Sequence, residues 1–568
     1  MKFSELSQYL EKLERVSSRL TITEILSDLF KITDVKEIDK VVYLILGGLA
    51  ARHENIVFNL SDKLIIRAVS EAYSADAKNI RECYKQIGDL GLVAESLPNK
   101  LQATSYKLSV NEVYENLKII ALDEGEGSVE RKITGVANLL KKLDPLSSRF
   151  VVRIPIGKLR LGFSDKTILD ALSWMEAGDK SSKKDLEAAY QVLPDVGLLA
   201  KNVKEQGIKK ATKNIKPITG TPVLPMLAQR LKSPVEMIKK MGKVSIEPKF
   251  DGLRIQIHYK KGQFTKAYTR NLNETSWMFP ELVNIKKQIK ADSVILDCEA
   301  VGLSEDAKKM VNFQVTMTRR RKHDVDVHSN KTPIRFQIFD ILEKNGQSLL
   351  SEPYLKRREI LDKTLNKGPL LVVDNYLITD NHEIITREHT VWLAKGLEGI
   401  IVKAIDSRYV PGRTGWRWVK MKEVESAAGK LADTVDCVVM GYSRGRGKRA
   451  QFGIGQFLAG IRDGEIIKTI TKVGTGLTDA QFKELKKRLT PLEINQKPVG
   501  YEVDKNLEPD FWVKPALVVE LAADEITISP IHTAGYALRF PRLIQFREDK
   551  SLKEVTSVNE IRELHALQ

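Results

Sequence analysis

One short stretch of this sequence combines the residue types of a nucleophilic site, Glu247-Pro-Lys-Phe-Asp-Gly-Leu-Arg254. A lysine such as Lys249 can act as a nucleophile once neighbouring cations and removal from water expose its neutral amine. The adjacent Asp251 favours the ammonium instead, so the pattern predicts a metal ion that offsets the carboxylates. Gly252 predicts a turn with a positive φ angle, and Arg254 offers a planar guanidinium for a phosphate. Taken alone, the stretch is equally compatible with a charged β-turn.

Two further charged residues lie where a bound nucleotide would need them. Arg270 comes just beyond a predicted strand, where it can reach a phosphate or a ribose. Glu299 alternates with the apolar Leu296, Cys298 and Ala300, so its carboxylate lies on the opposite face of the strand. There it can bind ribose hydroxyls or a metal. A surface charge is the alternative for either residue taken singly.

Three more segments supply an aromatic ring and paired charges. Phe339 can stack on a purine ring, although an aromatic residue in a strand more often belongs to the core. Glu398 and Lys403 flank one predicted strand. Lys420 and Lys422 share one face of another strand because side chains alternate, and together they can neutralise charge that develops on an α-phosphate.

The charge balance narrows the class of partner. Lysine and arginine outnumber aspartate and glutamate by 91 to 74 in 568 residues, a formal net charge of +17. Such an excess favours a polyanion, nucleic acid ahead of an acidic membrane surface, with general solubility as the alternative. The 3 cysteines are far apart, which argues against a disulfide scaffold or thiolate zinc site and predicts a cytoplasmic protein. No apolar run reaches the roughly 20 residues of a membrane span, and the N-terminus lacks a signal-peptide apolar region.

The first two hundred residues are predicted to be helical. Apolar residues recur at helical spacing from Phe3 to Leu20, and Thr21-Ile-Thr-Glu24 is typical of a capping box that opens the next helix. Lysine-rich sequence at 201–221 predicts a linker. The chain is long enough for several domains.

From about residue 221 the pattern changes to short β-branched strands. The middle region predicts an α+β domain with antiparallel sheets around a cleft, and the region after about residue 424 predicts a small barrel with a closing helix at 557–567. The expected strands are 292–301, 334–342, 399–403, 437–442, 455–462, 465–473 and 516–522.

Two basic segments are candidates for contact with a phosphate backbone. The first, Arg149–Gly162, combines glycines with spaced cations. The second, Gly441–Arg449, is a basic loop in the predicted barrel. A solvated charged surface is the alternative for both. The candidate contact residues are Arg153, Lys158, Arg160, Arg444, Arg446 and Lys448.

In this order and spacing the motifs resemble those of ATP-dependent DNA ligases, specifically the archaeal and eukaryotic replicative type. KFDGLR resembles the adenylation motif, and YTRNLNE, ILDCEAV, FQIFD, EGIIVK and WVKMK resemble the nucleotidyltransferase motifs that follow it. RFPRLIQFREDK is similar to the last motif. GDLG, GKLRLG and TPVLPMLAQ are similar to stretches of the N-terminal DNA-binding domain and its junction.

The resemblance implies a multidomain fold: an all-α N-terminal DNA-binding domain at 1–220, an α+β adenylation (nucleotidyltransferase) domain with antiparallel sheets at 221–424, and a C-terminal β-barrel of the OB-fold type at 425–568. It implies that the enzyme seals nicks between a 5′-phosphate and a 3′-hydroxyl in duplex DNA. The reaction would pass through a lysyl-AMP and a DNA-adenylate and release pyrophosphate and AMP, in replication, repair and recombination.

Residue roles follow from the same resemblance. Lys249 would carry AMP, Glu247 would select adenine and Phe339 would stack on it. Glu299 and Glu398 would hold Mg²⁺, for which Mn²⁺ can substitute. The other expected ATP contacts are Arg254, Arg270, Arg413, Arg417, Lys420 and Lys422, with Glu299 also near the ribose. Arg547, Asp549 and Lys550 would orient the departing pyrophosphate as the barrel closes on a hinge near Val424.

The sequence departs from the family pattern in two places. Thr414 stands where the family commonly has an arginine, and Arg413 or Arg417 is the replacement, with neither preferred. Archaeal relatives often carry a glutamine followed by paired aromatics for a sliding clamp, whereas residues 100–108 contain only Tyr106. We therefore expect that clamp-docking motif to be degenerate. Separately, we expect the protein to be a nucleoid-associated monomer without a membrane partner.

Two rival functions share parts of this pattern. An RNA ligase or a messenger-RNA capping guanylyltransferase has the lysine motif and a barrel, but the helical N-terminal region and RFPRLIQFREDK argue against both. A nucleic-acid scaffold with a decayed core is argued against by the intact charged residues, namely Lys249, Glu299, Glu398, Lys420 and Lys422.

Overall fold

The computed structural model describes residues 1–98, 108–159, 161–231, 233–306, 309–311, 316, 319, 332–412, 415–422, 434–445, 452–474, 477–523 and 525–566. The chain divides into two compact units. One comprises Met1–Asn59, Ala103–Leu143 and Phe163–Val424, and the other Leu60–Gln102, Asp144–Gly162 and Glu425–Gln568. Within the described ranges, no helix combines the length and the apolar character that crossing a bilayer requires.

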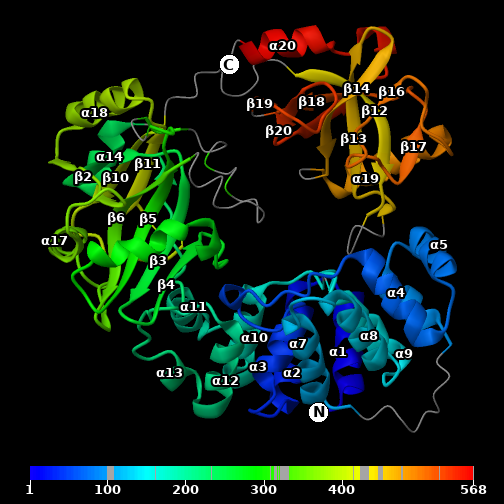
Figure 1. Ribbon diagram of the computed structural model, residues 1–568, viewed down its shortest axis with the longest axis horizontal. Coiled ribbons are helices and arrows are strands. Elements are labelled where there is room, and N and C mark those ends of the chain that lie inside the picture. The colour runs from blue at the N-terminus through cyan, green and yellow to red at the C-terminus, as the bar shows by residue number, and fades with distance from the viewer. Residues whose placement is uncertain are drawn as a thin grey trace. The chain divides into compact units, whose positions relative to one another are not determined.

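Helices dominate the N-terminal part, as the sequence predicts (Figure 1). Their bounds are α1 (Phe3–Arg15), α2 (Arg19–Ile32), α3 (Ile38–Ile45), α4 (Asp62–Tyr73), α5 (Ala77–Ile87), α6 (Leu90–Ser96), α7 (Val110–Leu122), α8 (Ser128–Leu140), α9 (Pro145–Arg153), α10 (Asp165–Ala177), α11 (Lys183–Val192), α12 (Val196–Gln206) and α13 (Ile208–Ala211).

Three local expectations in this part are wrong. The first helix ends at Arg15 instead of continuing to Leu20, which is 51% exposed. The next helix is capped by Ser18, whose hydroxyl accepts from the Thr21 amide at 3.4 Å, so the box expected at Thr21 lies inside α2. The linker expected at 201–221 is helical as far as residue 211, because α12 and α13 bury Leu199, Val203, Ile208 and other apolar residues.

The Gly88-Asp-Leu-Gly91 stretch is a helix junction. Gly88 ends α5 with a φ of +79°, and Asp89 caps α6 by accepting from the Leu92 amide at 3.1 Å. A Cβ at Gly91 would lie 2.5 Å from the Arg149 carbonyl oxygen. Glycine is therefore required here for α6 to pack closely on α9.

Two sheets form the middle region (Figure 1). The first has the order β1-β11-β10-β2-β9 and the second the order β4-β3-β5-β6-β7, with β8 beside β6. Pairing is antiparallel except for β1 with β11 and β6 with β8. The bounds are β1 (Gln229–Arg230), β2 (Val244–Lys249), β3 (Leu253–Lys260), β4 (Phe264–Thr269), β5 (Ser293–Gly302), β6 (Ile334–Lys344), β7 (Gln347–Ser348), β8 (Leu371–Val373), β9 (Leu377–Thr379), β10 (Gly399–Ala404) and β11 (Trp418–Lys422), with helices α14 (Pro234–Met241), α17 (Tyr354–Thr364) and α18 (His382–Ala394).

The C-terminal part is a second β-rich body. Its main sheet runs β15-β17-β12-β13-β14-β16, and β18 pairs with both β12 and β21. The bounds are β12 (Val435–Ser443), β13 (Gln456–Asp463), β14 (Ile466–Val473), β15 (Glu493–Ile494), β16 (Tyr501–Glu502), β17 (Phe511–Val513), β18 (Val518–Ala522), β19 (Glu525–Ile528), β20 (Tyr536–Arg539) and β21 (Arg542–Phe546), with helices α19 (Asp479–Leu489) and α20 (Val558–Ala566).

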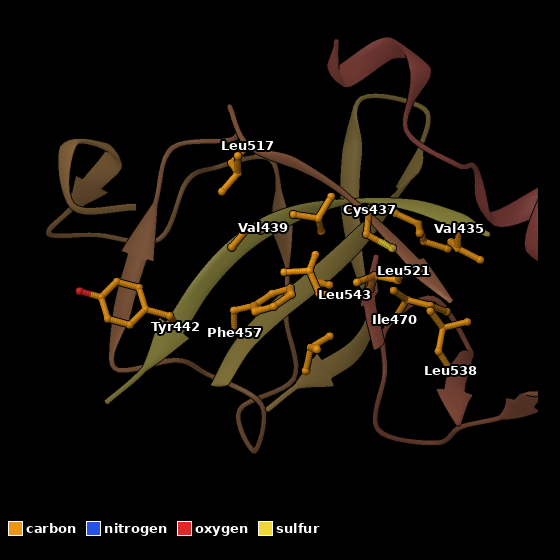
Figure 2. Packing of buried hydrophobic residues seen from close by; sticks show 14 of the residues in the cluster. Val435, Cys437, Val439, Tyr442, Phe457, Ile470, Leu517, Leu521, Leu538 and Leu543 are labelled. Carbon is orange, nitrogen blue, oxygen red and sulfur yellow. The ribbon is translucent and has the colours of Figure 1, made fainter. Parts of the chain in front are cut away.

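Strand β12 is the centre of this body because it is buried on both faces. Val435, Cys437 and Val439 enter one core, shown in Figure 2, while Val438 and Met440 enter a second core. A register shift between Val439 and Gly441 bends the strand where its partner changes from β18 to β17. The curled sheet confirms the expected barrel-type fold. The closing helix is confirmed too: Ser557 and Glu560 cap α20 reciprocally, at 2.6 and 3.3 Å.

Candidate active site

Lys249 is the last residue of β2, and the next strand, β3, belongs to the other sheet. The short link between them therefore carries the lysine from one sheet to the other. Gly252 in this link does not have the positive φ expected from the sequence. It is needed for space instead, because a Cβ there would lie 2.5 Å from the Ala300 carbonyl oxygen and 2.9 Å from Glu299 Cγ on β5.

The first sheet presents a charged face and an apolar face. Cross-strand register places Lys249 beside Gly399, and Gly399 beside Lys422, so the two lysines share a face. In the same way Glu247 and Lys420 both lie opposite Ile401. The residues between them form the apolar core on the other face: Val244, Ile246, Ile400, Val402, Val419 and Met421. The strand period thus places these charges on one side of the sheet.

A cavity of about 220 Å³ lies over this charged face. Its lining comes from both sheets, which confirms the expected cleft between them. Seven of the residues predicted from the sequence line it: Glu247, Lys249, Arg254, Arg270, Glu299, Phe339 and Lys420. The other lining residues include Pro248, Phe250, Asp374, Ile401, Lys403 and Trp418.

The Lys249 amine is held by a carboxylate. Glu398 forms ion pairs with Lys249 and, at 3.1 Å, with Lys422. Burial raises the pKa of Glu398, but its pairs with the two lysines outweigh burial and leave that pKa below its ordinary value. Burial raises the pKa of Glu299 to about 7, more than Lys249 and Arg254 lower it. The amine therefore contacts an ionised carboxylate, and it lines the same cavity as a second carboxyl group whose pKa is about 7.

Glu247 is tied to two partners that the sequence did not suggest. Its carboxylate pairs with the Lys403 ammonium at 2.6 Å, and each side chain is only 2% exposed. The Tyr354 hydroxyl of α17 donates to the other carboxylate oxygen. The Lys403 ammonium also lies 4.9 Å from the Phe339 ring centroid and 4.4 Å from that of Trp418. Burial lowers the pKa of Lys403 more than Glu247 raises it.

Arg254 is fixed by a second network. Its guanidinium binds Asp297 through two hydrogen bonds, of 3.1 and 2.7 Å, and donates to the Met226 carbonyl oxygen at 2.7 Å. The Tyr409 hydroxyl donates to Asp297 at 2.7 Å and accepts from the Met226 amide at 3.0 Å. Burial opposes the charge of Arg254, but Asp297 more than compensates and raises its pKa. The planar guanidinium of Arg254 is therefore fixed at the cavity wall, in a position to bind an anionic group.

The other predicted nucleotide contacts are placed as follows. Arg270 follows β4 directly, as expected. The Phe339 ring packs edge-on against Trp418 at 6.1 Å. Arg417 precedes β11, and its carbonyl accepts from the Ala404 amide at 2.9 Å. Arg413 and Thr414 lie outside the described residues, so the choice between Arg413 and Arg417 stays open.

The cations of the last motif are paired with acids in the C-terminal body. Arg547 contacts Asp436 at 3.3 Å and binds Asp549 at 2.9 and 2.7 Å. Lys550 contacts the other oxygen of Asp436 at 2.5 Å. Asp436 lies on β12, so the motif is anchored to the central strand of this body.

The predicted DNA contacts have internal partners where they are described. Arg153 pairs with Asp89 at 2.8 Å and is 5% exposed, and Lys158 pairs with Asp62 at 2.5 Å. Arg444 follows β12 and lies 5.0 Å from the Phe511 ring centroid. The other three candidates, Arg160, Arg446 and Lys448, lie outside the described residues, as do residues 100–107 of the clamp segment at 100–108 and the hinge residue Val424.

Sequence reasoning named Lys403 as a charge on one strand but not its pairing with Glu247, and it missed four other residues of the site: Tyr354, Asp297, Tyr409 and Asp374. Asp297 carried a usable signal, because it lies two residues from the predicted site residue Glu299 on the same strand. Tyr354 and Tyr409 carried none, since they approach from a helix and a loop distant in the sequence. No cluster of three or more metal-ligating side chains occurs among the residues described.

Family models match three consecutive parts of the chain. The DNA ligase N terminus matches residues 2–173, the ATP dependent DNA ligase domain 225–422, and the ATP dependent DNA ligase C terminal region 450–550. A relative named "Probable DNA ligase" from Dictyoglomus turgidum is 40% identical over 99% of this chain and 97% of its own length. This chain belongs to the ATP-dependent DNA ligase family.

Other members of the family are similarly related. A relative named "DNA ligase" from Sulfolobus acidocaldarius is 37% identical over 100% of this chain and 98% of its own length. A solved structure titled "Pmar-Lig_Pre." has a TM-score of 0.53 and 18% identity, and the match covers 96% of this chain and 99% of that one. This last similarity shows the fold. The three family models follow one another in the expected order, N terminus, middle domain and C-terminal region.

Proposed function

We propose that Lys249 is the residue that carries AMP in the DNA-sealing reaction of this ligase. The observation that supports it best is the position of the amine. It ends β2 on the charged face of the first sheet, lines the cavity and contacts Glu398. A nucleophile needs a fixed position, access for the substrate and a neighbouring charged group that influences its protonation.

In the first step the Lys249 nitrogen forms a bond to the α-phosphorus of ATP, and the bond to pyrophosphate breaks. The amine must first lose a proton, which its ion pair with Glu398 opposes. Lys420 and Lys422 lie on the same face and stabilise the negative charge that develops on the α-phosphate. Arg254 and Arg270 bind the remaining phosphates and the ribose, and Phe339 stacks on the base.

Mg²⁺ is the metal we assign to this site, with Mn²⁺ able to substitute. Glu299 and Glu398 fit such an ion because Glu398 contacts the amine and Glu299 lines the same cavity. Burial raises the pKa of Glu299 to about 7, and a bound cation would favour its ionised form. Two carboxylates suit Mg²⁺, because the rest of its coordination shell usually consists of water molecules and phosphate oxygens of the substrate. When bound, the ion polarises the α-phosphate.

The later steps use the rest of the chain. AMP passes from Lys249 to the 5′-phosphate of a nick, and the 3′-hydroxyl then displaces it. We assign the pyrophosphate-orienting role to Arg547 and Lys550, with Asp549 and Asp436 holding these cations in place until the C-terminal domain closes. The proposed domains are residues 1–220, 221–424 and 425–568, acting as a monomer.

Duplex DNA is the proposed partner, held mainly through its phosphates. The net charge of +17 supports this, and the proposed contacts are Arg153, Lys158, Arg160, Arg444, Arg446 and Lys448. Binding should weaken steeply with salt and depend little on sequence. Arg153 is the least exposed of those described, so its contribution includes the position of α9 as well as any phosphate contact.

A pulse-chase experiment tests the proposed function. The protein is incubated with Mg²⁺ and ATP or GTP labelled at the α-phosphate, and then chased with nicked DNA or nicked RNA. We expect an acid-labile label from ATP that moves to the 5′-phosphate of nicked DNA. A label from GTP alone would indicate capping chemistry, transfer only to RNA would indicate an RNA ligase, and no label at all would refute the proposal.

A further inference from the structure

Asp374 is a buried carboxyl group in the wall of the nucleotide cavity that has no role in the chemistry above. It directly follows β8 and is 5% exposed. It lines the same cavity as Lys249 and Phe339. Within the described part of the chain, its Oδ1 atom is buried without a hydrogen-bond partner. A buried acceptor left unpaired costs free energy, so a group that arrives with the substrate would find a partner here.

The backbone of Asp374 is held beside that of Phe339. Its amide donates to the Ile338 carbonyl at 3.0 Å, and Ile338 immediately precedes Phe339 on β6. The Arg358 guanidinium of α17 donates to the carbonyl oxygens of both Asp374 and Phe339, the latter at 3.5 Å. The Phe339 ring, proposed to stack on the base, and a carboxyl group that directly follows the neighbouring strand are thus fixed together. Such a carboxyl is placed to meet the edge of the base.

Glu247 is a second acidic residue in the wall of the same cavity, and both of its carboxylate oxygens have partners. Glu247 has one oxygen bound to Lys403 and the other to Tyr354. Its side chain is 2% exposed. These partners fix the Glu247 carboxylate in the cavity wall, where it keeps acceptor capacity for the base, so Asp374 would act beside it. Asp374 has no such partners on Oδ1 among the described residues.

The charges around Asp374 favour its protonated form. Burial raises the pKa of Asp374 well above its ordinary value, and Glu247 raises it further, against the opposing effects of Arg358 and Lys403. A neutral carboxyl offers one acceptor oxygen and one hydroxyl donor. The edge of adenine offers the complementary pair, an amino donor at position 6 and a ring acceptor at N1.

We propose that Asp374 binds the six-amino edge of the adenine and is a specificity-determining residue for the nucleotide. This assignment rests on the proposed function, since it places ATP in the cavity beside Lys249. In this assignment Phe339 contacts the face of the base, and Asp374 contacts its edge together with Glu247.

The test compares ATP with purine riboside triphosphate, which lacks only the six-amino group. Formation of the covalent lysyl-nucleotide is followed by intact-protein mass spectrometry, and kcat/KM is measured for each nucleotide. For the wild type we expect a preference for ATP of about tenfold, the effect of about 1.4 kcal/mol. In Asp374→Ala we expect most of this preference to be lost. In Asp374→Asn, whose amide retains an acceptor and a donor, most of the preference should remain.

Controls separate this assignment from a structural role and from failure of the function itself. Asn375→Ala, an exposed neighbour, should keep the wild-type preference. A merely structural Asp374 would lower both rates equally and leave the ratio unchanged in Asp374→Ala, which would overturn the proposal. Equal use of both nucleotides by the wild type would also overturn it, whether or not the variant folds. If Asp374→Ala does not fold, Asp374→Ser gives the same comparison. Absence of any nucleotide on the wild-type Lys249 would instead refute the function.

Discussion

Removing the ammonium of Lys403 should destabilise the middle region far more than removing a surface charge. The Lys403–Glu247 pair is 2.6 Å long, and both side chains are 2% exposed. Lys403→Met leaves Glu247 buried with only the hydroxyl of Tyr354 and the more distant Ser245 as partners. Breaking a buried pair on one side costs about 3–5 kcal/mol. That is a large share of the roughly 5–15 kcal/mol by which a domain is stable.

A double variant measures the coupling between Lys403 and Glu247. Glu247→Gln combined with Lys403→Met removes both charges, and replacing a buried pair by neutral groups is often close to neutral. We therefore expect the double variant to be more stable than Lys403→Met alone, with a coupling of about 2–4 kcal/mol. Lys356→Met is the matched control, because Lys356 is 54% exposed in its pair with Glu359, and it should change stability by less than about 1 kcal/mol.

Native-state hydrogen exchange, read by mass spectrometry on peptides from β2 and β10, is the appropriate assay. It reports local opening free energies and so avoids assuming that a chain of several domains unfolds in one step. If Lys403→Met and Glu247→Gln each cost little and their effects add, the pair is not buried in the way described. Glu247 and Lys403 would then not stabilise the fold as a coupled buried pair.

Three further predictions concern the scaffold around the cavity. Burial lowers the pKa of His258 to about 3, from 6.5. The unfolded chain thus binds a proton that the folded chain does not, and stability should fall as pH decreases from about 6.5 toward 3; urea unfolding should show a smaller acid loss in His258→Gln. Gly252→Ala would place a Cβ 2.5 Å from the Ala300 carbonyl oxygen, so we expect a loss of about 1–3 kcal/mol by thermal unfolding and slower adenylation. Tyr409→Phe removes the donor to Asp297, so KM for ATP should rise several-fold, through looser positioning of Arg254, with a smaller change in kcat; an unchanged KM would contradict that role.

The strands and the charged face could be read from the sequence because both depend on alternation. Glu299 lies opposite Leu296, Cys298 and Ala300, which enter the core of the second sheet. Lys420 and Lys422 share a strand and a face for the same reason. These predictions rest on a local period of two residues, which tertiary contacts did not alter.

The failures arise where a contact over a long sequence separation decides the outcome. Gly252 has an ordinary φ, and only the approach of β5 explains why a side chain cannot fit there. The Lys403–Glu247 pair joins positions 156 residues apart. The helix boundary at Arg15 is a local error, since Ser18 offered a cap as good as the one expected at Thr21.

The central claim is that the Lys249 nitrogen forms a bond to the α-phosphorus of ATP. Labelling with ATP marked at the α-phosphate, followed by peptide mapping, tests it directly in the wild type, in Lys249→Ala and in Lys260→Ala, an exposed lysine at the end of β3. We predict one AMP on the peptide that contains Lys249 in the wild type and in Lys260→Ala, and none in Lys249→Ala. Labelling of Lys249→Ala at the wild-type rate, or label on another residue of the wild type, would contradict the account.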